Sequence, residues 1–426
     1  MTTPRRGSYR TEVDAARWPD VATLPPGGLR TRVAQGLFER VAARLPLRIL
    51  LPDGRNIGAG DAADPVMLLI RPWALYRRLG AGGLIGFGEA YLAEDWTATD
   101  LPAVLTVFCR RMASLIPPPL QRLRDIAVHR HPRGDRGTIS NARNNISRHY
   151  DLSNDLFTLF LDESMTYSSA LFGPGDGSVE IAARAGFGDL PEAQRHKIDR
   201  LLDAAGVGPG SRVLEIGTGW GELALRAGAR GATVRSITLS EEQRTLALRR
   251  IAAAGLSDRV DVELCDYRAV QGSYDAVVSV EMIEAVGFEF WPQYFATLDR
   301  VLAPGGRVGL QAITMPHDRM LASRDTYTWI HKYVFPGGLI PSVTSVEESS
   351  SAAGLRVVSR HGFGLHYAET LRIWREGFTE RAGQVDALGF DDTFRRMWTF
   401  YLAYSEAGFR SRYLDVYQFV LAKGEL

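Results

Sequence analysis

The chain has few cysteines, no long apolar run and no excess of charge of one sign. Its two cysteines, Cys109 and Cys265, exclude a disulfide scaffold and a cysteine-rich zinc site. No stretch approaches the ~18 to 20 uncharged apolar residues that a membrane-spanning helix needs. With 50 basic and 49 acidic residues, the net charge of +1 gives no sign of nucleic-acid binding. No apolar run follows the N-terminal arginines, so we expect a cytoplasmic protein without a secretory signal.

The length of 426 residues exceeds that of one ordinary domain, and 45% hydrophobic residues with 23% charged residues is typical of a globular protein. We expect a flexible arm (1–25), an accessory α+β domain (26–116), a basic linker (117–144) and a larger domain (145–426). In the accessory domain we expect helices over Val33–Leu45, Gly83–Trp96 and Leu101–Leu115, and strands over Leu47–Leu51 and Val66–Ile70.

Arginine is concentrated around the predicted linker. Between Arg110 and Arg148 there are nine arginines against two aspartates. One interpretation is a solvated linker. The other is a basic surface for anionic lipid head groups, to which each basic residue near a bilayer contributes ~1 kcal/mol. Composition does not decide between the two.

From about residue 193 the sequence alternates between helical and strand patterns. Strands are predicted at Arg212–Ile216, Thr233–Thr238, Arg259–Leu264, Ala276–Val280, Arg307–Ile313 and Tyr413–Ala422. Helices are predicted at Gly221–Ala229, Glu241–Ala254, Trp291–Leu302, Glu369–Gly383 and Asp392–Glu406. This alternation predicts a mostly parallel sheet covered by helices on both faces.

The strongest local motif is a buried strand that runs into Gly217, Gly219 and Gly221 and then directly into a helix. Such glycines let the backbone approach a ligand at the carboxyl end of the first strand. The spacing is G-x-G-x-G, and the second strand ends in Thr-Leu-Ser240 without an acidic residue. A nicotinamide dinucleotide site is therefore disfavoured.

The E-x-G-x-G-x-G pattern resembles the first motif of class I S-adenosylmethionine (SAM) methyltransferases. That family commonly has an acidic side chain after the third strand, and Asp266 matches it. The alternative is a glycine-rich turn that binds no ligand.

Five longer segments of the sequence resemble one particular family of methyltransferases. They are 145–157, 160–168, 237–243, 333–338 and 366–371. Together they resemble the cyclopropane-fatty-acid synthase and mycolic acid methyltransferase family over about residues 145–423. The resemblance implies a class I fold with a seven-stranded, mostly parallel sheet and a smaller N-terminal domain. It also implies methyl transfer to a cis double bond of a phospholipid acyl chain.

Carried over by position, the family pattern assigns SAM contacts to one set of residues. These are Tyr167, Ser168, Glu215, Gly217, Gly219, Trp220, Gly221, Thr238, Leu239, Gln243, Asp266 and Tyr267. In cyclopropane-forming members a bicarbonate ion is the base, held by a Cys, a Glu, a His and a Tyr.

The chain keeps only half of that bicarbonate site. Glu284 and Tyr367 match the Glu and the Tyr, but Ser169 and Gln311 stand at the Cys and His positions. We therefore expect bicarbonate to bind poorly or in another pose, and Glu284 to belong to the deprotonating apparatus. Glu281 is a further candidate, with a capping or salt-bridge role as the alternative. No His, Asp or Glu spacing suggests a metal site.

The sequence thus predicts a SAM-dependent lipid methyltransferase that forms a 10-methylene fatty acid, the precursor of a methyl-branched chain. The alternatives are a cyclopropane-fatty-acid-phospholipid synthase, a small-molecule methyltransferase on the same fold, and a non-catalytic lipid-binding protein. The resemblance further implies peripheral association with the inner face of the membrane, a homodimer and a partner reductase, with no nucleic acid involved.

Overall fold

The computed structural model describes residues 13–115 and 153–423. Most of the basic segment 110–148 and the start of the predicted arm lie outside the described residues. The chain forms two compact units, and each is described by itself. Unit 1 comprises the described residues of Met1–Arg111 and Ala382–Tyr401. Unit 2 comprises those of Met112–Arg381 and Leu402–Leu426.

Unit 1 is a small α+β unit. Its elements are α1 (Pro19–Ala22), α2 (Leu29–Ala42), β1 (Arg48–Leu50), β2 (Val66–Leu69), α3 (Pro72–Leu92), β3 (Trp96–Ala98), α4 (Leu101–Leu115), α18 (Ala382–Ala387) and the first half of α19 (Asp392–Arg410). The sheet has the order β1-β2-β3, with β1 parallel and β3 antiparallel to β2. The predicted helix over 83–96 is wrong in its limits, because α3 starts earlier, bends at Gly83 (φ 55°) and ends before β3.

Residues 13–25, predicted as part of a flexible arm, are packed against α3. Val21 is buried. The buried Arg78 donates hydrogen bonds to the carbonyl oxygens of Asp20, Val21 and Thr23 at 2.9, 2.6 and 3.4 Å. One arginine thus satisfies three backbone acceptors and holds this segment in place.

The sequence places residues 382–401 in the larger domain, whereas their contacts group them with unit 1. The reason is aromatic packing. The ring of Phe400 on α19 lies 5.2 Å from Tyr91 and 6.4 Å from Trp96, measured between ring centroids. Helix α19 therefore contributes its first half to unit 1 and its second half to unit 2.

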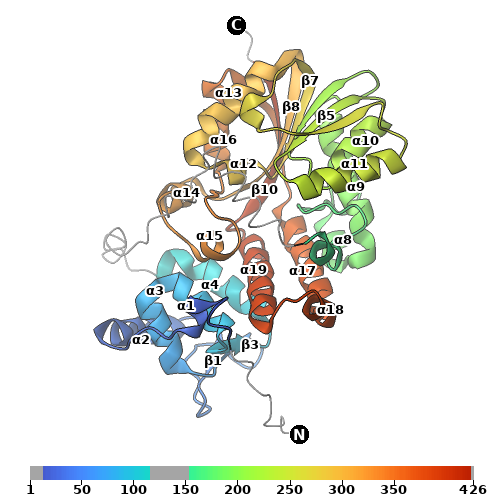
Figure 1. The fold of residues 1–426 in the computed structure, drawn as a ribbon. Helices are drawn as coiled ribbons and strands as arrows, with labels where there is room; N and C mark the ends of the chain where they lie inside the picture. Colours follow the sequence, from blue (N-terminus) through green and yellow to red (C-terminus); the bar gives the residue numbers. More distant parts are fainter. Residues whose placement is uncertain (1–12, 116–152, 424–426) are drawn as a thin grey trace. The chain divides into compact units, whose positions relative to one another are not determined.

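Unit 2 is built around a seven-stranded sheet of order β6-β5-β4-β7-β8-β10-β9 (Figure 1). Its strands are β4 (Arg212–Ile216), β5 (Thr233–Thr238), β6 (Val260–Leu264), β7 (Tyr274–Val280), β8 (Leu302–Thr314), β9 (Leu355–Gly362) and β10 (Asp415–Lys423). Strands β4 to β8 pair in parallel, and β10 is antiparallel to both β8 and β9. The predicted mostly parallel sheet is confirmed, and β9 is an edge strand that the sequence analysis missed.

Helices cover both faces of this sheet (Figure 1). The helices of unit 2 are α7 (Asn154–Thr158), α8 (Val179–Arg184), α9 (Leu190–Ala204), α10 (Glu222–Ala229), α11 (Glu241–Ala253), α12 (Ile283–Val286), α13 (Trp291–Val301), α14 (His317–Ser323), α15 (Trp329–Tyr333), α16 (Val343–Ala352) and α17 (Gly364–Glu380). One apolar core lies under α9, α10 and α11, and a second lies under α13 and α16. Among the described residues, no helix is long and apolar enough to cross a membrane.

Candidate active site

A turn of closely spaced glycines follows β4, and we call residues 217–221 the glycine turn. Gly217, Gly219 and Gly221 all have positive φ (96°, 52° and 93°), a region that strains residues with a Cβ. The amides of Gly217 and Thr218 both donate to the carbonyl of Ile237 in β5, at 3.0 and 3.1 Å. These bonds hold the turn at the carboxyl end of the sheet, where α/β proteins bind ligands.

The glycines of this turn face different surroundings. A Cβ added to Gly219 would meet no atom within 4 Å, whereas one added to Gly217 would lie 2.5 Å from Cγ of Met282. Gly219 therefore presents bare backbone to open space. Gly217 instead allows the loop after β7 to pack closely against the turn.

Most of the predicted cofactor residues near the turn bond to other side chains. Thr238 Oγ1 donates to Gln243 Oε1 at 2.9 Å, and Trp220 Nε1 donates to Asn154 Oδ1 at 2.7 Å. Leu239, next to Thr238, is half-buried. These bonds orient Trp220 in the turn and Gln243 at the start of α11.

Glu215, in β4, is linked to the glycine turn through Ser236. Ser236 Oγ donates to its carboxyl at 2.5 Å and lies 2.6 Å from Thr218 Oγ1. Burial raises the pKa of Glu215 to about 8, so the carboxyl is mostly protonated at neutral pH. A neutral carboxyl is consistent with its buried position, where no cation of the described residues pairs with it.

Asp266 and Tyr267 follow β6. The guanidinium of Arg268 donates to both oxygens of Asp266, at 2.8 and 2.6 Å. Burial would raise the pKa of Asp266, but Arg268 holds it below its ordinary value. The buried hydroxyl of Tyr267 has no hydrogen-bond partner within the described residues, and burial raises its pKa to about 12. An orphaned hydroxyl just after a strand of the parallel sheet fits a polar ligand group.

Four predicted and candidate residues from different segments meet at the end of β7, and we call them the carboxylate cage. They are Ser169, Glu281, Gln311 and Tyr367. The carboxylate of Glu281 accepts from the Ser169 amide at 3.1 Å, from Gln311 Nε2 at 2.8 Å and from the Tyr367 hydroxyl at 2.7 Å. Three residues at positions that the family resemblance matches to bicarbonate ligands thus hold a carboxylate of the chain itself.

The backbone of Glu281 is in an unusual conformation. Its φ is 53°, a region that costs a residue with a Cβ about 1–2 kcal/mol. The Glu281 amide donates to the carbonyl of Gln311 at 2.8 Å, which holds this conformation. Such strain in a well-held residue is common at functional sites.

The amide of Gln311 is oriented by a second glutamine. Gln418, its register partner on β10, donates Nε2 to Gln311 Oε1 at 3.1 Å. Gln418 Oε1 in turn accepts from Arg200 Nη1 at 2.8 Å. With its oxygen occupied in this way, Gln311 presents its NH₂ group to Glu281.

Glu284, predicted as the deprotonating carboxylate, lies outside this set of bonds. Its Oε1 accepts from the Ile313 amide at 2.5 Å, and its buried Oε2 has no partner among the described residues. Burial, and then the nearby Glu281, raise the pKa of Glu284 to about 8. The structure therefore brings Ser169, Gln311 and Tyr367 together on Glu281 rather than on Glu284.

A buried lysine, one of only three in the sequence, lies beside the carboxylate cage. Lys197 on α9 is fully buried, and its Nζ donates to Ser168 Oγ at 2.7 Å. Burial lowers the pKa of Lys197 to about 8, while the charge of Glu281 opposes that shift. Lys197 is a functional candidate that the sequence analysis missed. In the sequence, the only sign of its importance was that lysine is rare in this arginine-rich chain.

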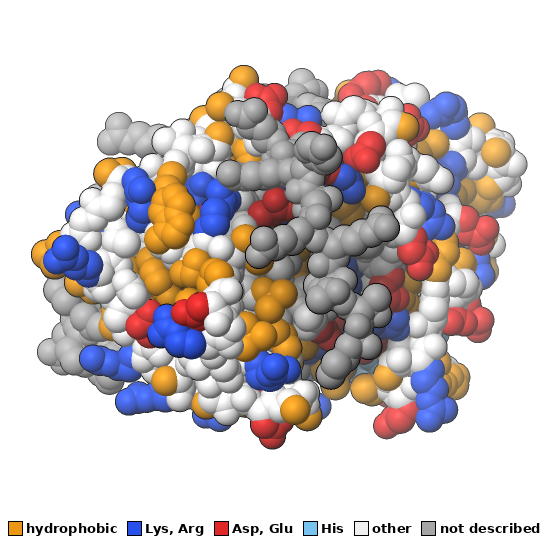
Figure 2. Space-filling model, turned by 90° about the horizontal axis from the view of Figure 1, so that it is seen from below, with side chains coloured by type: hydrophobic (Ala, Val, Ile, Leu, Met, Phe, Trp, Pro, Cys, Tyr) orange, Lys and Arg blue, Asp and Glu red, His pale blue; other side chains and the backbone are white. Residues whose placement is uncertain are grey.

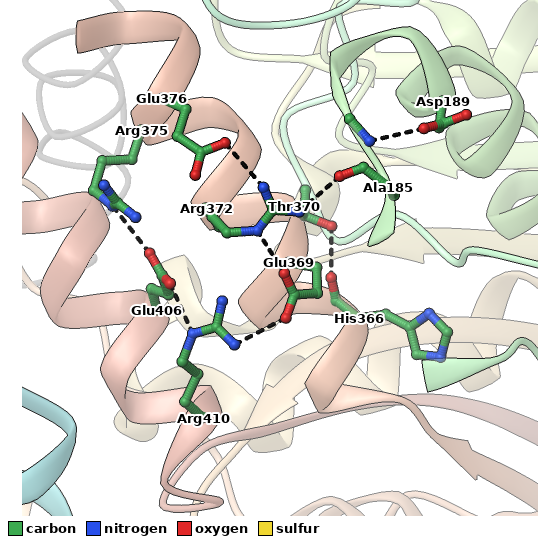
Figure 3. Close-up of polar contacts among 11 residues, drawn as sticks. Ala185, Asp189, His366, Glu369, Thr370, Arg372, Arg375, Glu376, Glu406 and Arg410 are labelled. Atoms are coloured by element: carbon green, nitrogen blue, oxygen red, sulfur yellow. Dashed lines mark hydrogen bonds and ion pairs between the residues drawn. The ribbon is translucent and has the colours of Figure 1, made fainter. Parts of the chain in front are cut away.

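Helix α17, which carries Tyr367, is tied to the second half of α19 by ion pairs. The network comprises Glu369, Arg372, Arg375, Glu406 and Arg410 (Figure 3). Arg410 bridges Glu369 and Glu406 at 2.8 and 2.7 Å. Burial would raise the pKa of Glu369, but its two arginines hold it below its ordinary value. Because each of these largely buried carboxylates is paired with two arginines, losing Arg410 would leave each with one partner and would weaken the link between α17 and α19.

Comparison with known proteins places this site in a family. A match to the family described as mycolic acid cyclopropane synthetase covers residues 138–419. The chain is 52% identical to the tuberculostearic acid methyltransferase UfaA1 of Mycobacterium tuberculosis over 99% of both chains. The chain belongs to the mycolic acid cyclopropane synthetase family.

Two proteins named as cyclopropane synthases are also similar to this chain, at lower sequence identity. The cyclopropane-fatty-acyl-phospholipid synthase of Escherichia coli is 31% identical, over 85% of this chain and 90% of its own length. A solved mycolic acid cyclopropane synthase, CmaA1, complexed with SAH and CTAB, has a TM-score of 0.59 and 32% identity over 66% of this chain and 98% of its own.

This member of the cyclopropane synthetase family is a SAM-dependent methyltransferase, and SAM is its cofactor. The residues present fit that group. The open space at Gly219 provides bare backbone at the carboxyl edge of the sheet, and the hydroxyl of Tyr267, which has no partner in the part of the chain that the structure describes, provides a polar group. Tyr167 and Ser168 lie on the segment that leads into the carboxylate cage, with the Tyr167 ring 5.2 Å from Phe157.

Proposed function

We propose that this enzyme methylates a cis double bond in an unsaturated phospholipid acyl chain and forms a methylene-branched product. The 52% identity to a tuberculostearic acid methyltransferase over nearly the full length of both chains supports a branched product. The likeness to a cyclopropane-fatty-acyl-phospholipid synthase supports the phospholipid substrate.

The reaction requires a base. When bound, SAM supplies an electrophilic methyl group. Methylation of one alkene carbon leaves a cation on the neighbouring carbon of the acyl chain. If a proton then leaves the new methyl group, its electron pair closes a cyclopropane ring. If a hydride shifts between the two chain carbons first, loss of that proton leaves an exocyclic methylene. Both products need one group that accepts one proton.

The observation that carries the proposal is the convergence of three donors on the Glu281 carboxylate. We propose that Glu281 is this base and takes the role that a bicarbonate ion has in the cyclopropane-forming relatives. Burial raises the pKa of Glu281, which suits a proton acceptor, while Tyr367 and Lys197 oppose the shift and favour the ionised form.

Glu284 is less suited to this role. Among the described residues its carboxyl accepts one hydrogen bond, from the Ile313 amide, and burial with the nearby Glu281 raises its pKa to about 8, which favours the protonated form. We propose that Glu284 lines the site as a neutral group, and that its ionisation is opposed by Glu281.

Product analysis tests the proposed function. The protein would be expressed in a host rich in oleoyl lipids, and the extracted lipids examined by proton NMR. Vinylidene signals are expected, and they should be absent with Glu281→Gln. Cyclopropane signals alone would contradict the branched product, and unchanged lipids would contradict the acyl-chain substrate.

The proposed substrate and product imply two partners. We propose that the enzyme associates peripherally with the membrane that holds its substrate, and that a separate reductase converts the methylene group to a methyl branch. The homodimer expected from the family resemblance stays a prediction, which analytical ultracentrifugation would test.

A further inference from the structure

The outer face of α2 in unit 1 is unusually apolar. Leu29, Val33 and Leu37 are spaced four residues apart and therefore form one stripe along the helix. Their side chains are 77%, 53% and 36% exposed. A surface helix of a globular protein normally turns polar residues outward, so an apolar outer stripe indicates a binding surface.

The opposite face of α2 already has a partner in α3. The ring of Phe38 lies 5.9 Å from that of Tyr76, whose hydroxyl donates to Glu39 Oε1 at 3.3 Å. A Cβ added to Gly80 of α3 would lie 2.8 Å from the carbonyl oxygen of Arg30, so the two backbones are closely packed. The stripe is thus distinct from the side of α2 that faces the core of unit 1.

Basic side chains border the stripe. Arg30, Arg32 and Arg40 on α2 and Arg44 just beyond it are exposed. Within the described part of the chain, none of them forms an ion pair with a carboxylate. Glu39 is the one acidic residue of α2, and it bonds on the packed side. Figure 2 shows hydrophobic side chains gathered between Lys and Arg side chains on the face seen from below.

We propose that the outer face of α2 binds the surface of a bilayer that contains anionic phospholipids. The apolar stripe matches the boundary between head groups and acyl chains, and the flanking arginines match lipid phosphates. The inference rests on the proposed function, since an enzyme that methylates phospholipid acyl chains must reach them in a bilayer.

Charge favours this occupant over a second copy of the chain. A two-fold symmetric contact would place the same patch against itself and bring the arginines of both helices together. Like charges facing one another across an interface are unfavourable, whereas an anionic surface neutralises them.

Vesicle co-sedimentation of the full-length protein tests the proposal. The vesicles contain saturated phosphatidylglycerol and phosphatidylcholine, so binding does not require the methylation reaction. Leu29→Asp with Val33→Asp is expected to weaken binding at least tenfold. Arg30→Gln with Arg32→Gln is expected to weaken it about 25-fold, at ~1 kcal/mol for each arginine, and to reduce its dependence on salt.

Arg356→Gln with Val358→Asp is the matched control, because both residues are exposed on β9 of unit 2. This control should bind like the wild type. Circular dichroism checks that each variant is folded. If the aspartate variant is unfolded, the arginine variant alone tests the proposal.

The proposal would be overturned if the α2 variants bound the vesicles as tightly as the wild type, or if the wild type did not bind them. A wild-type dimer that the α2 variants dissociate would assign the face to a second copy instead. Methylation of an unsaturated phospholipid dispersed in detergent tests the proposed function separately, and the α2 variants should retain that activity.

Discussion

The glycine turn and the carboxylate cage lie at the same edge of one sheet, after the neighbouring parallel strands β4 and β7. The turn is made from one short segment, and the amides of its first two residues bond to the neighbouring strand β5. The cage joins Glu281 to residues 112, 30 and 86 positions away. A cofactor surface can therefore be encoded locally, whereas the proton acceptor depends on the correct packing of α17, β8 and the segment around Ser169.

This difference predicts that a change in the cage should stop chemistry and leave cofactor binding intact. Glu281→Gln keeps the size of the side chain but cannot accept the proton. Turnover should fall by about 10³-fold or more, within the usual range for a general base. SAM affinity, measured by calorimetry, should change little. Near-normal turnover would remove Glu281 from the deprotonation step.

A change in the turn should have the opposite effect. Gly219→Val places a branched side chain in the open space where SAM must meet bare backbone. We expect SAM affinity to fall at least 100-fold, with a loss of about 1–2 kcal/mol of folding stability from the positive φ. Gly255→Val is the matched control, because Gly255 has a φ of 67° and equally open surroundings. Retained SAM affinity in Gly219→Val would contradict the cofactor site.

Lys197 lies beside the cage, since it bonds to Ser168 and acts on the charge of Glu281. Lys197→Met removes the cation while keeping a long, buried side chain. The pKa of Glu281 should rise further, so the ascending limb of the pH–rate profile should move to higher pH. Turnover at neutral pH should fall on the order of tenfold. Lys423→Met is the control, and an unshifted profile for Lys197→Met would make Lys197 purely structural.

The smallest expected effect is on stability. Because burial raises the pKa of Glu284 from 4.5 to about 8, the folded state binds this proton more tightly than the unfolded state. The resulting stabilisation is complete below the unfolded pKa and is lost as the pH rises through about 8. Glu284→Gln cannot titrate, so the free energy of unfolding should fall less steeply between about pH 5 and pH 8. Denaturant unfolding at several pH values would show the slope, and an unchanged slope would contradict this assignment.

The same contrast explains what could be read from the sequence. The limits of β4 and β5 and the glycine turn are predicted correctly, because alternation, apolar runs and glycine spacing are local signals. Ser169, Gln311 and Tyr367 are named in advance through the family resemblance, whereas Glu281 is named only as a further candidate and is not linked to them. Glu281 lies only three residues from Glu284, and its positive φ, which no local pattern reveals, directs it into the cage.

Other features depend on distant contacts and were missed for that reason. Residues 13–25 are ordered by one buried arginine more than fifty positions away in the chain. The first half of α19 joins unit 1 because of aromatic rings on α3 and β3. Neither contact leaves a periodic signal in the segment that it holds.

The central claim is that the base belongs to the chain itself. The most direct measurement is wild-type turnover in buffer depleted of carbon dioxide, with and without added bicarbonate, and with products followed by proton NMR. We expect equal rates under both conditions and vinylidene signals in both products. Turnover that appears only when bicarbonate is added would contradict the account, because Glu281 would then hold an ion or a proton for another base.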